Sequence, residues 1–153
     1  MLETFLPLIQ AAQDLDLTDP KSAVEELERR FDPTGPEAAA LNQALEGLLA
    51  DGAIAGRGEL PVMWSRVTKA SEESQGFSID VVRMTGPGPK HRHPKGEVNY
   101  CLARAGEPTF DGFPAGWVVM PPDSVHVPTV AGGEMLIVYL LPEGAMEFLE
   151  APA

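Results

Sequence analysis

The sequence predicts a mainly β chain with an α-helical segment at its N-terminus. After residue 58, short apolar runs alternate with turns rich in glycine and proline, which is typical of a β-sandwich or barrel. Before residue 58, apolar residues recur at helical spacing. The chain has 153 residues and 44% hydrophobic content, enough for one domain with a real core. We therefore divide it into a helical segment, residues 1–58, which packs on the barrel or on a dimer partner, and a β-barrel, residues 59–153.

Three helices are predicted in the first segment, because apolar residues recur there at intervals of three and four. Asp19 followed by Pro20 is typical of a helix start, since aspartate caps the first turn and proline suits its first position. Gly52 is typical of a helix end. Pro7 lies near a first turn, where proline is tolerated. The predicted helices span residues 2–15, 20–32 and 36–51.

The second segment is predicted to hold strands, because its short apolar runs are bounded by turn residues. The last run, residues 135–141, is apolar without alternation, which predicts a strand covered on both faces. Residues 86–89, Gly-Pro-Gly-Pro, predict a turn that leads into a strand carrying two histidines. The predicted strands include residues 62–67, 77–84, 97–102, 116–120 and 135–141.

All three histidines of the chain lie in one pattern with a glutamate. His91 and His93 project from the same face of an extended strand, because alternate residues of a strand do so. Residues 94–96, Pro-Lys-Gly, form a bend that lets Glu97 turn toward the same point, and His126 arrives from a later strand. Imidazoles with one carboxylate suit iron, manganese, nickel, cobalt, copper or zinc. We therefore expect these four residues to hold a divalent transition metal; a metal-free pocket on the same fold is the alternative.

Composition and charge indicate which partners and which cellular compartment to expect. The net charge of −12 argues against nucleic acid and anionic membranes, since both attract clustered lysine and arginine. No run of eighteen apolar residues is present, and the N-terminus lacks the positive region of a secretory signal, so we expect a cytoplasmic protein. The single cysteine, Cys101, excludes an internal disulfide and is expected to be a buried small residue. Barrel edges and apolar helix stripes need covering, which favours a homodimer.

The histidine pattern resembles the two motifs of the cupin superfamily. The first motif is matched, in order, by Gly86, His91, His93, Glu97 and Gly106. The second is matched by Pro121 and His126, with Asp123 where cupins have glycine and Val130 where they have asparagine. Aspartate tolerates turn conformations, so the glycine change leaves the turn plausible. The resemblance implies a double-stranded β-helix, a jelly-roll-like barrel, with a metal near its centre and the helical segment outside it.

Several strings in order resemble the bacterial 4-hydroxylaminobenzoate lyase family. They are residues 76–82 (GFSIDVV), 91–97 (HRHPKGE), 111–117 (DGFPAGW), 126–130 (HVPTV) and 139–144 (YLLPEG). The resemblance covers roughly residues 62–149. It implies a cytoplasmic enzyme of nitroaromatic breakdown that converts 4-hydroxylaminobenzoate and water to protocatechuate and ammonia.

Such a substrate is a flat ring with a carboxylate at one end and an N–OH group at the other, so it needs a cation and an apolar wall. Arginine pairs with a carboxylate through two parallel hydrogen bonds. We favour Arg66 over Arg83 and Arg104, because Arg66 shares a strand face with Trp64, which offers a ring contact. The alternative for Arg66 is an ordinary surface position.

Further pocket residues follow from strand parity. Asn99 shares a face with Glu97 and is expected to line the pocket. Tyr139 and Trp117 are candidates for the ring wall, with a place in the core as the alternative. The predicted substrate-binding residues are therefore Arg66, Trp64, Asn99 and Tyr139.

The chemistry is expected to depend on the metal, which would act as a Lewis acid on the hydroxylamine oxygen. With a metal bound, Glu97 is a ligand; without one, Glu97 or His126 would serve as general acid and base, so these two are the predicted catalytic residues. Two rival functions stay open, because fold does not decide function. One is a mononuclear iron dioxygenase with the same donor set, and the other is a non-catalytic cupin that binds a small molecule.

Overall fold

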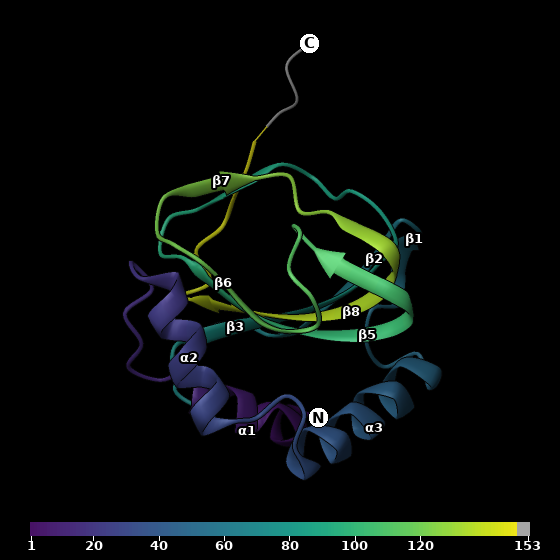
Figure 1. Cartoon of the computed structure of the whole chain (residues 1–153), viewed down its shortest axis with the longest axis horizontal. Helices are drawn as coiled ribbons and strands as arrows, with labels where there is room; N and C mark the ends of the chain where they lie inside the picture. Colours follow the sequence, from purple (N-terminus) through teal and green to yellow (C-terminus); the bar gives the residue numbers. More distant parts are fainter. Residues whose placement is uncertain (150–153) are drawn as a thin grey trace.

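Three helices pack under one of two antiparallel sheets in the computed structural model, which describes residues 1–149 (Figure 1). The helices are α1 (Leu2–Ala11), α2 (Pro20–Arg30) and α3 (Pro36–Ala50). Asp19 caps α2 by accepting a hydrogen bond from the Ser22 backbone N–H, as its place before Pro20 predicts. None of the helices formed by residues 1–149 combines the length and the apolar character that a membrane crossing requires.

The strands form a six-stranded and a three-stranded sheet. The larger sheet has the order β1-β2-β3-β8-β5-β6 and the smaller has β7-β4-β9. In chain order the strands are β1 (Arg57–Glu59), β2 (Val62–Thr68), β3 (Phe77–Met84), β4 (His91–His93), β5 (Glu97–Phe110), β6 (Gly116–Met120), β7 (Ser124–His126), β8 (Val130–Pro142) and β9 (Glu147–Phe148). The chain crosses between the sheets after β3, β4, β6, β7 and β8, so the two sheets close around a common interior. This arrangement confirms the predicted mainly β fold, a double-sheet barrel with N-terminal helices.

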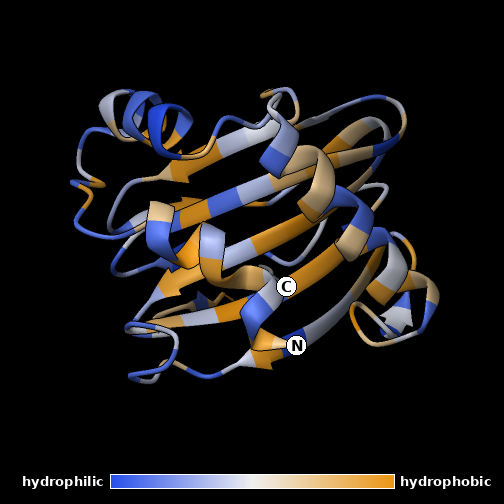
Figure 2. Ribbon diagram, turned by 90° about the horizontal axis from the view of Figure 1, so that it is seen from below, coloured by the Kyte–Doolittle hydropathy of each residue, from blue (hydrophilic) through white to orange (hydrophobic). Residues whose placement is uncertain are grey.

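The larger sheet is apolar on both faces. Val138 and Leu140 of β8 pack in the same cluster as Phe5 and Leu45 from the helices. Figure 2, seen from the helix side, shows the hydrophobic strand residues behind the helices. The alternate residue Ile137 packs in a second cluster, inside the barrel. The prediction that residues 135–141 are covered on both faces is therefore confirmed. The helical segment and the barrel share one hydrophobic core. The division of the chain into two parts at residue 58 stays a prediction.

The first helix is shorter than predicted, and the reason is a tertiary contact. It ends at Ala11 instead of residue 15. The guanidinium of Arg30, at the end of α2, donates hydrogen bonds to the carbonyls of Ala11 and Gln13, which satisfies acceptors that another helical turn would have used. Asp14 then adopts a left-handed backbone conformation with φ of 54°, which ends the helical path.

Two strands are longer than predicted, and two short edge strands, β1 and β9, were missed. Strands β5 and β8 stay paired from Val98 and Leu140 as far as Phe110 and Val130, through two irregularities. Gly133 permits this close approach, because a Cβ atom there would lie 1.9 Å from the Ala105 carbonyl oxygen. The glycines and proline along this stretch obscure the strand in the sequence, although they make the bulges possible.

Candidate functional site

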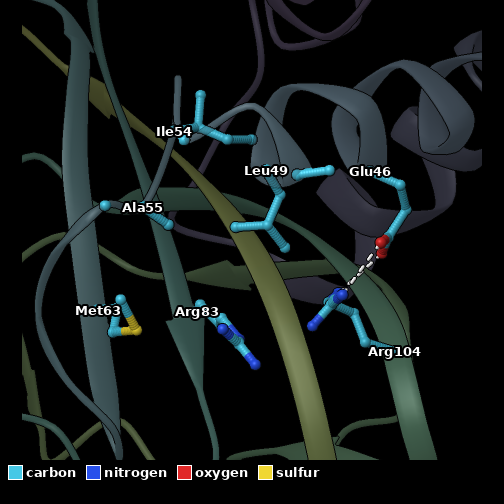
Figure 3. A pocket seen from close by; sticks show the side chains of 10 residues that line it. Glu46, Leu49, Ile54, Ala55, Met63, Arg83 and Arg104 are labelled. Atoms are coloured by element: carbon cyan, nitrogen blue, oxygen red, sulfur yellow. Dashed lines mark hydrogen bonds and ion pairs between the residues drawn. The ribbon is translucent and has the colours of Figure 1, made fainter.

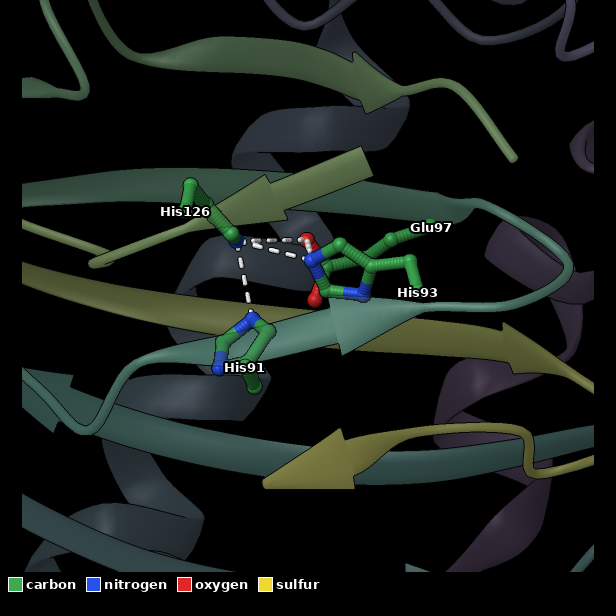
Figure 4. Close-up of side chains that lie close together, drawn as sticks. All are labelled: His91, His93, Glu97 and His126. Carbon is green, nitrogen blue, oxygen red and sulfur yellow. Dashed lines mark hydrogen bonds and ion pairs between the residues drawn. The ribbon is translucent and has the colours of Figure 1, made fainter. Parts of the chain in front are cut away.

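Three histidines and one glutamate converge inside the barrel (Figure 4). His91 and His93 lie on the same face of β4, and His126 on β7 is paired directly opposite His91. Glu97 begins β5 on the facing sheet. One ligand atom from each residue lies within 4.8 Å of the others. The structure therefore brings together all four residues that the sequence pattern proposed as metal ligands.

Glu97 reaches the site because the chain reverses sharply at the residue before it. Gly96 has φ of 86°, a conformation that glycine adopts without steric cost. A Cβ atom at this position would lie 2.9 Å from both the Leu17 Cδ1 atom and the Met120 carbonyl oxygen. The bend at residues 94–96 thus needs glycine both for its backbone angle and for space, and it delivers Glu97 to the interior.

Hydrogen bonds at the outer nitrogens orient the histidine rings. Nδ1 of His91 donates to the Pro89 carbonyl oxygen at 3.1 Å, and Nδ1 of His126 contacts the Asp111 carboxylate. A carbonyl or carboxylate only accepts, so both Nδ1 atoms carry the proton and, in neutral rings, both Nε2 atoms carry a lone pair. These two Nε2 atoms lie 2.8 Å apart. Two lone pairs at this distance repel each other, and a cation between them would remove the repulsion.

The electrostatics also suit cation binding. Burial lowers the pKa of His91 to about 4 and that of His93 to about 3, so both rings are neutral near pH 7. Burial raises the pKa of Glu97 to about 8, against the effect of a hydrogen bond from Asn99. A nearby cation would reverse the shift at Glu97, because it stabilises the carboxylate. Among the described residues, Nδ1 of His93 and Oε1 of Glu97 are buried without a hydrogen-bond partner.

The donor distances fit a first-row transition metal. Two ligands about 2.1 Å from one ion lie about 3.0 Å apart when their bonds are perpendicular. Nε2 of His126 lies 2.7 Å from Nε2 of His93. Oε2 of Glu97 lies 3.3 Å from Nε2 of His93 and 3.8 Å from Nε2 of His126. Three nitrogens and one carboxylate oxygen are donors that iron, manganese, cobalt, nickel and zinc all accept. The four residues can therefore hold such an ion together.

The predicted substrate residues occupy neighbouring rows on the inner face of the larger sheet. The strand register aligns Arg66 with Asp80, Asp80 with Tyr139, and Tyr139 with Asn99. Trp64 lies on the same face of β2, opposite Val82. Sequence parity had placed Trp64 and Arg66 on one face, and the pairings place that face on the inner side of the larger sheet. Trp64 is 44% exposed and the Arg66 side chain 47% exposed, so both lie at an open part of the barrel. Whether these residues bind substrate remains a prediction.

Each of these side chains already has a local partner. Arg66 forms an ion pair with Asp80, with 2.9 Å from Nε to Oδ1. The Asn99 amide donates to Oε2 of Glu97 at 2.9 Å, so it orients the glutamate, while its own oxygen has no partner among residues 1–149. The Tyr139 hydroxyl lies 3.7 Å from the sulfur of Met84. Asp80 carries a negative charge beside Arg66 that the sequence analysis did not consider.

Other residues considered for the pocket lie on the opposite side of the sheet. Arg83 and Arg104 line a cavity of about 320 Å³ beside α3 (Figure 3). Arg104 pairs there with Glu46, and Arg83 pairs with Glu134. Trp117 is in the helix-side core. The choice of Arg66 over the other two arginines stays a prediction, whereas the alternative of a core position is confirmed for Trp117.

Two further positions agree with the sequence analysis. Cys101 is buried, 2% exposed, and burial raises the pKa of its thiol, as expected for a small core residue and not for a nucleophile. Asp123, which stands where the cupin motif has glycine, has φ of 65°, a conformation that aspartate tolerates.

Three residues near the histidines were missed by the sequence analysis. Phe110 packs edge-on against His126 with 6.2 Å between ring centroids, and Phe148 packs against His91 at 6.0 Å. Asp111 contacts Nδ1 of His126. The Asp-Gly pair at 111–112 is a recognisable turn signal. Nothing in the sequence indicates that its carboxylate returns to a histidine fifteen residues later.

A family model described as 4-hydroxylaminobenzoate lyase (PnbB) matches residues 7–148. The chain belongs to the 4-hydroxylaminobenzoate lyase family. The match includes the helical segment, which the resemblance in the sequence strings did not cover. All four candidate ligands and Asp111 lie within it.

One relative and two solved structures illustrate these similarities. A 4-hydroxylaminobenzoate lyase from Nocardioides sp. (strain LMS-CY) is 33% identical over 94 residues, which are 55% of this chain and 54% of that protein. This chain thus spans about half the length of that relative. An RmlC-like cupin from Ralstonia eutropha JMP134 has 15% identity and a TM-score of 0.46, covering 63% of this chain and 65% of that one. A cupin-like protein from Thermotoga maritima MSB8 has 17% identity and a TM-score of 0.43, covering 64% and 86%.

Proposed function

We propose that the protein is a metal-dependent lyase that converts 4-hydroxylaminobenzoate, or a closely related hydroxylamino-aromatic acid, to protocatechuate and ammonia. Membership of the lyase family supports the reaction class. The observation that carries the metal is the convergence of His91, His93, Glu97 and His126, with lone pairs of two rings facing each other at 2.8 Å. The proposed cofactor is iron, manganese, nickel, cobalt or zinc, all of which accept these donors.

The overall reaction balances without an external oxidant. One N–O bond, one C–N bond and one ring C–H bond next to the nitrogen-bearing carbon break, together with one O–H bond of water. Two ring C–O bonds and two N–H bonds form, so that one water is consumed and one ammonia is released. The nitrogen is reduced from the hydroxylamine to the ammonia level while the ring carbon is oxidised. A bound metal would supply Lewis acidity at the hydroxylamine oxygen. The barrel interior excludes bulk water, which strengthens electrostatic interactions with the reacting groups.

The inner face of the larger sheet offers a path for the substrate ring. Neighbouring strands are about 4.8 Å apart, so the backbone of Arg66 on β2 lies about 14 Å from that of Asn99 on β5. A benzoate ring with its substituents, together with the long arginine side chain, suits this span. We propose that Arg66 binds the substrate carboxylate. Tyr139, which lies between Arg66 and Asn99 across the sheet, would contact the ring. Trp64, 44% exposed, would cover the ring from the open end.

Anaerobic turnover tests the proposal directly. Purified protein of known metal content is incubated with 4-hydroxylaminobenzoate without oxygen, and ammonia and protocatechuate are measured. We expect both products in equal amounts, and chelation followed by reloading should remove and restore them. No product from metal-loaded protein would contradict the lyase. Oxygen uptake with a catechol would then point to the dioxygenase, and tight binding without turnover to a non-catalytic cupin.

Arg66→Met is expected to raise the KM for 4-hydroxylaminobenzoate much more than it lowers kcat. A hydrogen bond to a charged group is worth about 1.5–3 kcal/mol, which corresponds to a loss of about 10- to 150-fold in kcat/KM. Steady-state kinetics measures the change. Arg92→Met is the matched control, because Arg92 lies between the two histidines on β4 but pairs with Asp123 at 3.1 Å, away from the interior.

Arg66→Met also leaves the Asp80 carboxylate unpaired, so the double variant Arg66→Met/Asp80→Asn separates lost attraction from added repulsion. The double variant should recover only part of the affinity. An unchanged KM in Arg66→Met would show that another cation binds the carboxylate.

A homodimer and a cytoplasmic location complete the proposal. In the described part of the chain, residues 1–149, the outer edge of β1 has no paired strand and its residues are all exposed, which supports the homodimer.

A further inference from the structure

We propose that Asp111 is a positioning residue, which holds His126 in the one tautomer and orientation that can serve the candidate metal centre. This inference rests on the proposed function only in taking the four residues as metal ligands. Asp111 lies in the turn after β5 and His126 on β7, fifteen residues later. The two side chains meet because Asp111 Oδ2 contacts His126 Nδ1.

The position of Asp111 is defined by two hydrogen bonds to Thr129 and by the closed turn in which it lies. Its Oδ1 atom accepts a hydrogen bond from the Thr129 backbone N–H at 2.8 Å, and its own N–H donates to the Thr129 carbonyl at 2.9 Å. The turn is closed by reciprocal backbone bonds between Phe110 and Phe113, of 2.8 and 2.9 Å. Asp111 itself has φ of 49°, a conformation that aspartate tolerates. The Thr129 N–H thus fixes one carboxylate oxygen and the closed turn fixes the backbone, while the other oxygen meets His126.

The carboxylate decides which nitrogen of His126 carries the proton. A carboxylate accepts hydrogen bonds, so Nδ1 of His126 is protonated and the Nε2 lone pair points at His91 and His93. Within residues 1–149, His126 is the histidine of the three that has a carboxylate at Nδ1. His91 has a backbone carbonyl there, and Nδ1 of His93 has no partner.

His126 needs this support more than the other two histidines do. Its side chain is 13% exposed, whereas that of His93 is completely buried and therefore held by its surroundings. His126 is also the last residue of the three-residue strand β7, which among residues 1–149 pairs with β4 alone. Without Asp111, the ring would be free to turn about χ2 or to move its proton to Nε2. Either change removes the lone pair from the site.

The experiment compares Asp111→Asn and Asp111→Ala with Asp14→Asn. The control places the same substitution at an aspartate with similar φ, 54°, in the helical segment. Cobalt(II) affinity of the full chain is measured by competition with a chelator, together with the cobalt absorption spectrum. We expect the affinity to fall about 10- to 100-fold in Asp111→Ala, and less in Asp111→Asn, whose amide oxygen can still accept from Nδ1. The spectrum should change with it, while Asp14→Asn matches the wild type.

A second readout does not depend on the metal or on turnover. Nitrogen NMR of ¹⁵N-histidine-labelled, metal-free protein at pH 8 reports the tautomer of each ring. The wild type should show His126 protonated at Nδ1, and Asp111→Ala should show Nε2–H as well. An unchanged tautomer together with unchanged cobalt affinity in folded Asp111→Ala would overturn the proposal. If the wild type binds cobalt but releases no ammonia from 4-hydroxylaminobenzoate, the proposed lyase reaction is contradicted. The cobalt affinity and the histidine tautomer still decide the role of Asp111 in that case.

Discussion

Glu97→Gln is expected to empty the candidate metal centre and to abolish turnover of 4-hydroxylaminobenzoate. Glutamine keeps the shape of Glu97 but loses the negative charge that offsets a divalent cation. Removing an outer partner of a ligand costs about 10- to 100-fold in metal affinity, and removing a ligand itself should cost at least about 100-fold. Metal content after dialysis and anaerobic product release measure the two effects.

The metal-free form of this variant should remain as stable as metal-free wild type near pH 7. Burial raises the pKa of Glu97 to about 8, so the wild-type carboxyl group is already protonated there and glutamine resembles it. Glu143→Gln is a suitable control, because Glu143 pairs with Lys95 on the surface at 3.1 Å. A variant that keeps its metal and still loses activity would show that Glu97 acts as an acid or base instead of a ligand.

Trp117→Ala is expected to lower the free energy of unfolding by about 3–5 kcal/mol, the usual cost of removing a large aromatic side chain from a core. Trp117 is 6% exposed, and its ring N–H donates to the Phe31 carbonyl at 2.9 Å. It also packs edge-on against Phe31 and Tyr100. The substitution therefore weakens the contact between the helical segment and the barrel. Urea denaturation measures the loss.

Trp64→Ala serves as the matched control for Trp117→Ala. Trp64 is 44% exposed and lies on the inner face of the sheet, with Arg57 over its ring at 5.3 Å. Its removal should change stability much less and the KM for the substrate more. Trp117→Phe, assayed where it remains folded, should keep the wild-type KM. A raised KM in Trp117→Phe with unchanged stability would place Trp117 in the pocket and contradict the structure.

Much of the local structure followed from periodicity and turn residues. The strands at residues 77–84 and 116–120 begin and end where they were predicted, because apolar runs there are bounded by clear turns. The helix predicted from residue 36 is also observed. Three of the four candidate ligands, His91, His93 and Glu97, were predicted from local spacing, since a strand places alternate residues on one face and a glycine bend returns the next residue to it. These signals depend only on residues close together in the sequence.

Features that depend on distant residues were predicted wrongly or missed. The end of α1 depends on Arg30 of the next helix, and the length of β5 depends on its pairing with β8. The contact of Asp111 with His126 joins a hairpin turn to a strand of the other sheet. None of these has a local pattern that reveals its partner, because each joins residues that are far apart in the sequence.

What the sequence by itself determined was the fold class, the family and which residues share a strand face. Parity grouped Trp64 with Arg66. It could not say which face of each strand meets the helices and which faces the barrel interior. The central strands of the larger sheet carry buried apolar residues on both faces, so hydrophobicity does not distinguish the two faces. Only the tertiary structure decided that Arg66 lies on the inner face while Arg83 and Trp117 lie on the helix side. The reason is that the helices cover one face of the sheet, and the other face then lines the barrel.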